Sequence, residues 1–320
     1  MTKLRVVFLD RATIPSQISI KPLSFEHDWV EYDFTQPNQV AQRVKDADIV
    51  ITNKVVLNAA NLSQATQLRF IAVSATGVNN IDLEYCQSNA ISVSNIQGYA
   101  TQSVPEHVIA MLFALKRNLK GYHQDIEGDV WQRDKQFCFF THPIQDIAGS
   151  TLGVIGSGSL GQATAALAKA IGMNVIFAER KGKSQCREGY MSFEEVLKAA
   201  DAISLHCPLT TQTENMLSSA EFQMMKSNCV LINTGRGGLV DEVALVEALR
   251  SGEIAGAGVD VFTAEPADKS NPLLANSDLP NLLLTPHVAW GSDSAIQKLA
   301  DILMDNIDAF AAGAAQNLVT

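Results

Sequence analysis

The stretch from residue 151 to residue 181 constrains the fold of this chain more than any other. Thr151–Ile155 is a short β-branched run that leads into the turn Gly156-Ser157-Gly158-Ser159-Leu160-Gly161. An alanine-rich helical pattern follows over residues 162–171, and Asn174–Ala178 has the pattern of a second strand. This order of strand, glycine turn, helix and strand predicts one βαβ unit.

The glycine spacing of this unit indicates a dinucleotide site. Gly156 permits the tight turn, Gly158 lets a pyrophosphate approach the backbone, and Gly161 allows close packing of helix and strand. The phosphates would bind at the helix N-terminus. Glu179 stands 18 residues after Gly161, where a carboxylate can accept both hydroxyls of an adenosine ribose. The alternative is a glycine turn that only packs.

Length and composition exclude several classes of protein. With 320 residues and 47% hydrophobic content, the chain can form two domains with large cores. The net charge of -10 and the absence of a long basic run argue against a nucleic-acid partner. No signal peptide or membrane-spanning run is recognisable, and five scattered cysteines indicate reduced thiols rather than disulfides or a metal site. We therefore expect a cytoplasmic protein.

The remaining pattern predicts an α/β fold with two doubly wound parallel-sheet domains. Strands are expected at residues 4–9, 29–34, 49–52, 70–73, 91–94, 202–206, 229–233, 256–261 and 282–284. Helices are expected at residues 39–45, 82–89, 192–200, 219–225, 241–251 and 294–312, the last packing back on the first domain. We assign residues 1–98, completed by 291–320, to a flavodoxin-like substrate domain. Residues 99–290 form a Rossmann dinucleotide-binding domain, with the active-site cleft between the two.

The region between the domains contains a helix and an aromatic segment. Ser103, Pro105 and Glu106 have the spacing of a helix start with Ser103 as cap. The segment that follows is irregular and rich in large aromatic residues, namely Tyr122, Trp131, Phe137, Phe139 and Phe140. Such residues favour a subunit interface, and hence a homodimer, over a loop folded on its own domain.

Three charged residues follow strand ends of the second domain, where a bound cofactor would lie: Arg236, Glu265 and His287. An arginine can bind a carboxylate in a fork, a histidine can exchange a proton near neutral pH, and a glutamate can support the protonated histidine. Each one alone is more typical of a surface charge or a structural histidine. Together they indicate reduction of a 2-oxo acid by a nicotinamide cofactor.

Two loops of the first domain follow predicted strands. Asn53-Lys54 comes after the third strand, and residues 74–80 come after the fourth. The second loop is rich in small residues and can present consecutive N–H groups to a carboxylate. A plain turn before the next helix is the alternative.

Motifs along nearly the whole chain resemble the NAD(P)-dependent D-2-hydroxyacid dehydrogenase family. They are VVFLDRATIP, ITNKVVL, SATGVNNIDL, NIQGYATQSVPEHVIAMLFAL, WQRDKQFCFF, the glycine motif, HCPLTTQT, INTGRGGLVDE, GVDVFTAEP and LTPHVAW. The resemblance implies that Arg236, Glu265 and His287 are catalytic. It implies that the carboxylate-binding loop is formed by Ala75, Thr76 and Gly77. We also assign Asn53, Arg236 and Trp290 to the substrate site. The implied cofactor contacts are Ser159, Leu160, Glu179, Cys207, Pro208, Thr213, Thr234 and Asp260. We also assign the three glycines, Arg180, Gly235 and His287 to the cofactor site, and His206, which ends a predicted strand, to the lining of the cofactor cleft.

The resemblance is strongest to members that interconvert hydroxypyruvate and D-glycerate, so we expect that reaction with a small-molecule substrate. Another short 2-oxo acid, glyoxylate or pyruvate, is the alternative within enzymes. An NAD(H)-sensing interaction protein on the same fold is the alternative from another class. We expect NAD as the cofactor, although Arg180, Lys181 and Lys183 could host the 2′-phosphate of NADP.

Overall fold

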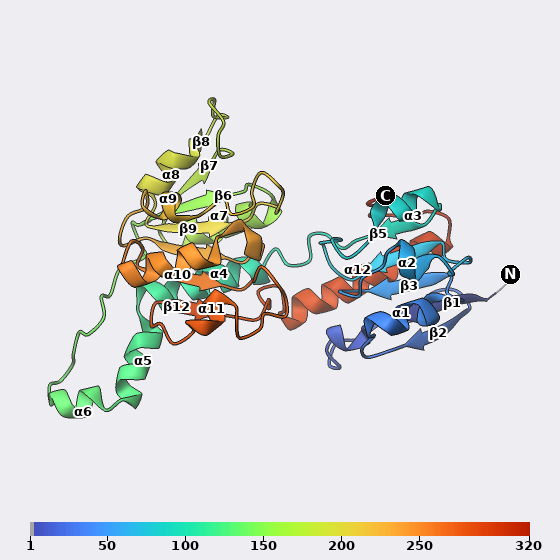
Figure 1. Ribbon diagram of the computed structural model, residues 1–320, viewed down its shortest axis with the longest axis horizontal. Coiled ribbons are helices and arrows are strands. Elements are labelled where there is room, and N and C mark those ends of the chain that lie inside the picture. Colours follow the sequence, from blue (N-terminus) through green and yellow to red (C-terminus); the bar gives the residue numbers. More distant parts are fainter. Residues whose placement is uncertain (1–2) are drawn as a thin grey trace. The chain divides into compact units, whose positions relative to one another are not determined.

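The computed structural model describes residues 3–320 and divides the chain into two compact units. The smaller unit is formed by Met1–Tyr99 together with Gly291–Thr320, and the larger by Ala100–Trp290. Each contains one sheet flanked by helices (Figure 1). The predicted α/β class with two parallel sheets is confirmed, because the described strands pair in parallel within a five-stranded and a seven-stranded sheet.

The smaller sheet has the strand order β2-β1-β3-β4-β5, which is the flavodoxin-like order. Its strands are β1 (Leu4–Phe8), β2 (His27–Glu31), β3 (Ile49–Thr52), β4 (Phe70–Val73) and β5 (Ser92–Ser94). Its helices are α1 (Val40–Val44), α2 (Ala59–Leu62), α3 (Leu83–Ser88) and α12 (Asp293–Ala311). The predicted bounds are correct for β3 and β4. They are displaced for β2, an edge strand whose residues are all partly exposed.

The two faces of this sheet are covered by different helices. Val7 and Val50 belong to a buried cluster shared with α1, α2 and α3. Because side chains alternate along a strand, the neighbouring residues face the other way. On this opposite face of the sheet, the Phe70 ring of β4 stacks on the Phe310 ring of α12, with the ring centroids 4.3 Å apart. The closing helix therefore packs on the first domain, as predicted.

The larger sheet has the order β12-β11-β10-β9-β6-β7-β8. Its strands are β6 (Thr151–Ile155), β7 (Asn174–Ala178), β8 (Tyr190–Met191), β9 (Ala202–Leu205), β10 (Val230–Asn233), β11 (Gly256–Val259) and β12 (Leu282–Leu284). Its helices are α4 (Ser103–Lys116), α5 (Leu119–Glu127), α6 (Val130–Asp134), α7 (Ser159–Ala170), α8 (Phe193–Ala199), α9 (Ser219–Phe222), α10 (Glu242–Ser251) and α11 (Pro272–Ala275). Pairing of β6 with both β7 and β9 creates the point where the strand order reverses, and nucleotides bind at such points.

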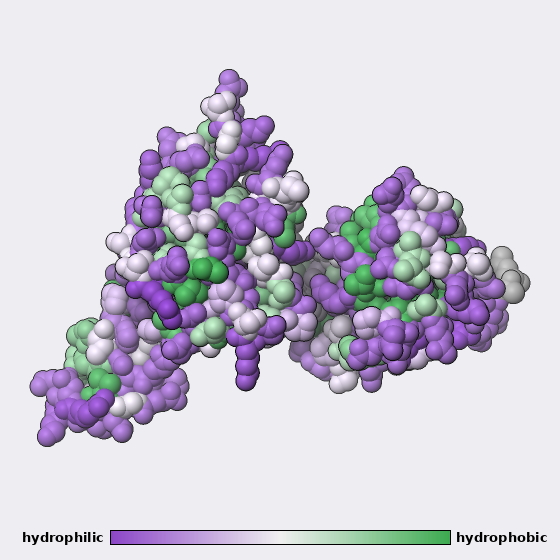
Figure 2. All heavy atoms as spheres, viewed as in Figure 1, coloured by the Kyte–Doolittle hydropathy of each residue, from purple (hydrophilic) through white to green (hydrophobic). Residues whose placement is uncertain are grey.

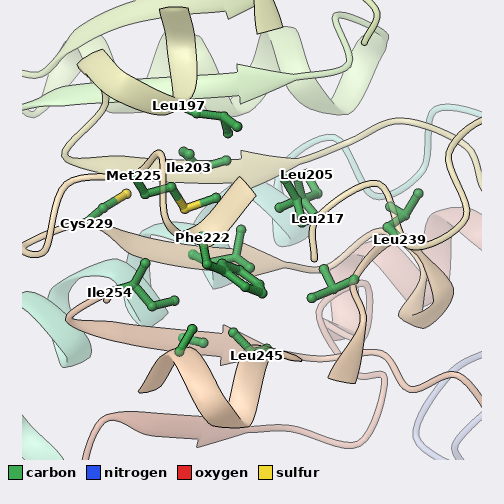
Figure 3. Close-up of a cluster of buried hydrophobic side chains, with 14 of the residues drawn as sticks. Leu197, Ile203, Leu205, Leu217, Phe222, Met225, Cys229, Leu239, Leu245 and Ile254 are labelled. Atoms are coloured by element: carbon green, nitrogen blue, oxygen red, sulfur yellow. The ribbon is translucent and has the colours of Figure 1, made fainter. Parts of the chain in front are cut away.

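A buried apolar layer fixes one face of the larger sheet. Figure 3 shows side chains of β9, such as Ile203 and Leu205, packed against Phe222, Leu217 and Leu245 from the segments that cover them. Helices α4 and α7 pack against each other on the remaining face, where α4 contacts β10 and β11. This two-sided burial explains why the strands appear in the sequence as short continuous apolar runs.

Two predictions about residues 103–140 are wrong. Ser103 is the first residue of α4 and not its cap, because the cap position belongs to Gln102. The segment expected to be irregular contains helices α5 and α6, and residues 135–144 then run without regular structure. The polar residues among the aromatic ones hid the helical period. Within residues 3–320, none of the helices combines the length and the hydropathy that a bilayer crossing requires.

Candidate active site

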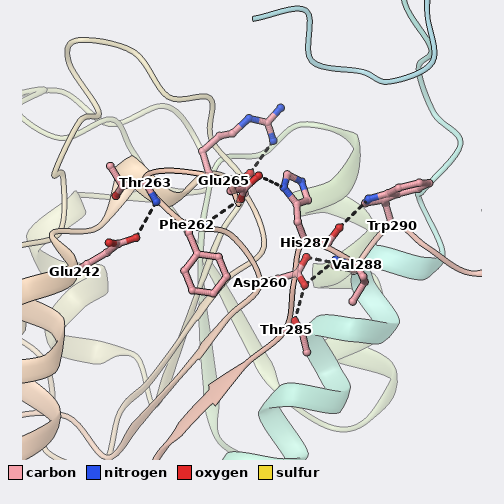
Figure 4. A network of polar contacts seen from close by, with 12 residues as sticks. Glu242, Asp260, Phe262, Thr263, Glu265, Thr285, His287, Val288 and Trp290 are labelled. Carbon is pink, nitrogen blue, oxygen red and sulfur yellow. Dashed lines mark hydrogen bonds and ion pairs between the residues drawn. The ribbon is translucent and has the colours of Figure 1, made fainter. Parts of the chain in front are cut away.

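His287 and Glu265 form the central contact of the candidate site in the larger unit. His287 Nδ1 lies 2.7 Å from Glu265 Oε2, and Glu265 Oε1 accepts the N–H of Phe262 at 3.0 Å (Figure 4). The two side chains retain 27% and 34% of their exposure. Because Nδ1 is engaged, Nε2 is the ring nitrogen that can exchange a proton with a ligand.

The buried Asp260 carboxylate holds the segment that carries His287. It accepts hydrogen bonds from the Thr285 hydroxyl and from the N–H groups of Val288 and Ala289, both at 2.9 Å. The Asp260 carbonyl accepts the His287 N–H at 2.7 Å. Within this frame His287 adopts a left-handed φ of 56°, which is uncommon for a residue other than glycine. The sequence predicted that Asp260 contacts the cofactor. In the structure its carboxylate accepts hydrogen bonds from groups of this chain.

Two further residues complete this frame. His107 of α4 places Nε2 3.1 Å from Thr285 Oγ1 and 3.8 Å from the Asp260 carboxylate. Trp290, expected in the substrate site, donates its indole N–H to the His287 carbonyl at 2.9 Å. The Trp290 carbonyl in turn accepts the Ser103 hydroxyl at 3.1 Å. The chain on both sides of His287 is therefore anchored to β11 and α4.

Arg236 follows β10 in a loop that packs closely on the loop of Glu265. A Cβ on Gly237 would lie 2.0 Å from the Phe262 carbonyl carbon, so only glycine permits this approach. Asn233 organises the loop, since its side chain accepts the Gly235 N–H at 3.0 Å and donates to the Arg236 carbonyl at 2.8 Å. The structure thus brings the loops of Arg236 and Glu265 together at the ends of β10 and β11.

The glycine turn after β6 has the geometry of a phosphate-binding loop. Gly156 has φ 99°, and a Cβ there would lie 2.5 Å from the His206 carbonyl carbon. A Cβ on Gly161 would lie 2.0 Å from the Gly156 carbonyl oxygen. No described atom lies within 4 Å of a Cβ built on Gly158, which leaves open space over the start of α7, where Ser159 and Leu160 stand. These residues fit a dinucleotide pyrophosphate.

A second feature of this region fits a bound nicotinamide cofactor. The hydroxyl of Thr234, directly after β10, is buried and has no hydrogen-bond partner among the described residues. A buried polar group of this kind is expected to bind a ligand or water. Together with the glycine turn, it supports the predicted cofactor site.

Glu179 lies at the end of β7 and is already fully engaged. Its carboxylate accepts Arg187 Nε at 2.6 Å, Arg187 Nη2 at 3.0 Å, the Arg180 N–H at 2.8 Å and the Arg187 N–H at 3.2 Å. The side-chain bonds from Arg187, with the backbone bond from Arg180, lower the pKa of Glu179 to about 2. Sequence reasoning placed Glu179 at the ribose and did not anticipate Arg187.

The segment after β9 lines the glycine turn. Burial lowers the pKa of His206 to about 4, and the ring Nε2 lies 2.8 Å from the Ser204 hydroxyl, so the imidazole is neutral near pH 7. Burial raises the pKa of Cys207 to about 11, which excludes a reactive thiolate. Thr213, expected to contact the cofactor, donates its hydroxyl to the Pro208 carbonyl at 2.8 Å and so shapes this loop.

In the smaller unit, the two candidate loops follow β3 and β4. Asp10 fixes the first loop, because its buried carboxylate accepts the N–H groups of Asn53 and Lys54. Burial is the main cause that raises the pKa of Asp10, and these backbone hydrogen bonds oppose it. The second loop holds Ala75, Thr76 and Gly77, and the Thr76 hydroxyl donates to the Ile96 carbonyl at 2.7 Å.

Several anchoring residues were not found from the sequence, notably Asp10, Thr285 and Arg187. Each acts through a partner that is distant in sequence or lies in a loop without periodicity, so no local pattern marks it. Across residues 3–320, no group of His, Cys, Asp and Glu side chains could hold a metal ion. The five cysteines are free thiols.

The neutral, buried state of His206 predicts a specific pH dependence of stability. Its folded-state pKa of about 4 lies below the ordinary value of 6.5, so the unfolded chain takes up the proton first as pH falls. The contribution of His206 should be constant above pH 6.5 and should be lost between about 6.5 and 4. Urea unfolding of wild type and His206→Asn from pH 7.5 to 4.5 measures it. The difference in free energy of unfolding between wild type and His206→Asn should change only between about pH 6.5 and 4. A difference that stays constant as the pH falls through this range would contradict the neutral, buried state of His206.

Comparison with known proteins identifies the family of this chain. The family model for the NAD binding domain of D-isomer specific 2-hydroxyacid dehydrogenases matches residues 109–289. A Haemophilus influenzae protein described as a 2-hydroxyacid dehydrogenase is 50% identical over 308 residues, which cover 96% of this chain and 98% of that one. The glycerate dehydrogenase of Methylorubrum extorquens is 45% identical over 320 residues, covering 100% and 99%.

A solved structure supports the same relationship. The D-lactate dehydrogenase of Aquifex aeolicus, complexed with NAD and lactic acid, matches with a TM-score of 0.80 and 27% identity over 98% of both chains. The chain therefore belongs to the D-isomer specific 2-hydroxyacid dehydrogenase family and is an NAD-dependent oxidoreductase that acts on CH–OH groups.

Proposed function

We propose that this protein catalyses the reversible reduction of hydroxypyruvate to D-glycerate, with His287 as the proton donor. The observation that carries the proposal is the 2.7 Å contact between His287 Nδ1 and Glu265, beside the loop of Arg236. A proton donor, its carboxylate partner and a guanidinium are the groups that reduction of a 2-oxo acid requires.

The proposed mechanism assigns one task to each of these side chains. When bound, NADH supplies the hydride. His287 gives the proton on Nε2 to the carbonyl oxygen of the substrate, since its Nδ1 is held by Glu265. Glu265 orients the ring and stabilises its positive charge before transfer. Arg236 binds the substrate carboxylate, for which its planar fork is suited.

The smaller unit supplies further groups for a carboxylate. We assign substrate binding to Asn53 and to the backbone N–H groups of residues 75–77. Asp10 is the positioning residue for Asn53, because its carboxylate binds the Asn53 N–H at 2.9 Å. Hydroxypyruvate is favoured as the substrate by the 45% identity to a glycerate dehydrogenase over the whole chain.

A panel of substrates tests the proposal. Steady-state oxidation of NADH should give a kcat/KM for hydroxypyruvate at least about tenfold above those for glyoxylate and pyruvate, which corresponds to about 1.4 kcal/mol in transition-state binding. A higher kcat/KM for glyoxylate or pyruvate would show that hydroxypyruvate is not the preferred substrate, and it would leave the proposed roles of His287, Glu265 and Arg236 unchanged. NADH binding without turnover of any 2-oxo acid would overturn the enzyme assignment in favour of a sensing role.

Substitution of the proton donor tests the mechanism. His287→Asn should lower kcat by about 10²- to 10⁴-fold, because the variant lacks the group that protonates the carbonyl oxygen. The dissociation constant for NADH, measured by fluorescence titration, should change little. His123→Asn is the matched control, since His123 is exposed and pairs with the exposed Glu127. A His287→Asn enzyme with wild-type kcat would refute the role of His287.

We further propose that the protein is a homodimer joined through the aromatic arm, residues 119–144. Figure 2 shows hydrophobic residues among hydrophilic ones on the surface of this arm. Phe137 and Phe140 keep 93% and 78% of their exposure, and Trp131 keeps 46%. Exposed aromatic residues gathered on one segment are typical of an interface between protein subunits.

Light scattering after size-exclusion chromatography tests the dimer. The wild type should elute at twice the chain mass of 34.6 kDa. The double variant Phe137→Glu/Phe140→Glu should elute as a monomer, because two buried charges would disrupt an apolar interface. Phe34→Glu, at a similarly exposed phenylalanine of the smaller unit, should remain a dimer. A monomeric wild type would contradict the proposal.

A further inference from the structure

The ion pair between Glu179 and Arg187 occupies the place where a nucleotide ribose would be recognised. A carboxylate offers about four lone-pair sites, and Glu179 uses them for two side-chain and two backbone hydrogen bonds. Glu179 itself is 5% exposed. In this arrangement its carboxylate has no site left for a ribose hydroxyl, and its charge is neutralised by the guanidinium.

The position of Arg187 follows from the pairing of β8 with β7. Phe177 pairs with Tyr190 and Ala178 with Met191, so the chain between these strands forms a loop of residues 180–189 beside Glu179. The Arg187 guanidinium lies 3.9 Å from the centroid of the Tyr190 ring. Tyr190 also donates its hydroxyl to the Ser157 hydroxyl at 2.7 Å. Arg187 is thus linked through Tyr190 to the glycine turn.

The guanidinium keeps donors for a ligand. Arginine carries five N–H donors, and Glu179 receives two from the side chain. The Arg187 side chain is 53% exposed. Lys181, by contrast, is committed elsewhere, because its ammonium binds Glu221 at 2.7 Å and the Met216 carbonyl at 3.0 Å. Arg187 is therefore a cation whose side chain is fixed next to the ribose-recognising acid by two hydrogen bonds.

We propose that Arg187 is a specificity-determining residue that lets the adenosine end of the site accept a 2′-phosphate, so that the enzyme binds NADPH as well as NADH. The inference rests on the proposed dehydrogenase function and extends it to cofactor choice. Paired with Arg187, Glu179 no longer repels a phosphate, and the remaining guanidinium donors can bind it. When the pair opens, Glu179 can accept the ribose hydroxyls of NADH.

Binding of nucleotide fragments tests this inference without any reaction. The probes are 2′,5′-ADP, which carries the 2′-phosphate, and 5′-AMP, which lacks it, titrated calorimetrically into the full-length protein. Arg187→Gln should weaken 2′,5′-ADP binding by about tenfold or more, because a charge-assisted contact is lost and the Glu179 charge is exposed. Binding of 5′-AMP should stay equal or become tighter, since Glu179 is released.

Three further variants sharpen the test. Glu179→Gln should show the reverse pattern, with weaker 5′-AMP binding and undiminished 2′,5′-ADP binding. Arg187→Lys keeps the charge without the fork and should fall between wild type and Arg187→Gln. Lys181→Gln is the matched control and should leave the ratio of the two affinities unchanged.

The outcomes separate this inference from the proposed function. Equal weakening of both probes in Arg187→Gln, no change in either, or a wild type that fails to bind 2′,5′-ADP would overturn the inference. If the protein does not reduce hydroxypyruvate, the inference about Arg187 is unaffected, because neither 2′,5′-ADP nor 5′-AMP contains a nicotinamide or undergoes a reaction. A shift in the affinity ratio in Arg187→Gln and Arg187→Lys, absent in Lys181→Gln, would establish Arg187 as the determinant.

Discussion

The buried Asp260 carboxylate is the interaction on which the candidate site depends. An unpaired buried carboxylate is costly, so its bonds to Thr285, Val288 and Ala289 must form together as the chain leaves β12. These bonds determine the path of the segment and support the left-handed backbone of His287. The 2.7 Å contact with Glu265 is therefore preorganised before any ligand binds.

Two ion pairs with different surroundings serve the two ends of the site. Glu265 and His287 are both partly exposed, which suits the proposed exchange of a proton with a substrate. Glu179 is buried and forms a bidentate contact with Arg187, which suits the proposed recognition of a 2′-phosphate by Arg187 and not proton transfer. The sheet places each carboxylate at the carboxyl end of a parallel strand, β7 for Glu179 and β11 for the loop of Glu265.

The success of sequence reasoning depended on whether a feature has a local period. Central strands such as β3, β4 and β6 are almost entirely buried, so their continuous apolar runs predicted the bounds of these strands correctly. The two-residue strand β8 has no such run and was missed, and with it the approach of Arg187 to Glu179. The Arg–Glu–His set was predicted because each member follows a strand, and the structure places His287 and Glu265 in contact. Asp260 was assigned to the cofactor from the family resemblance. Its hydrogen bonds to the N–H groups of Val288 and Ala289 could not be predicted, because no sequence pattern reveals backbone partners.

The central claim is that this site transfers hydride to the 2-carbon of hydroxypyruvate while His287 protonates the oxygen. Incubation of the protein with hydroxypyruvate and NADH deuterated at C4 of the nicotinamide tests it most directly, with NMR to locate deuterium in the product and chiral chromatography to assign its configuration. The account predicts D-glycerate with deuterium on C2 when the label is on the transferred face, and no deuterium at C2 when only the solvent is labelled. L-glycerate, solvent deuterium at C2, or no product at all would contradict it.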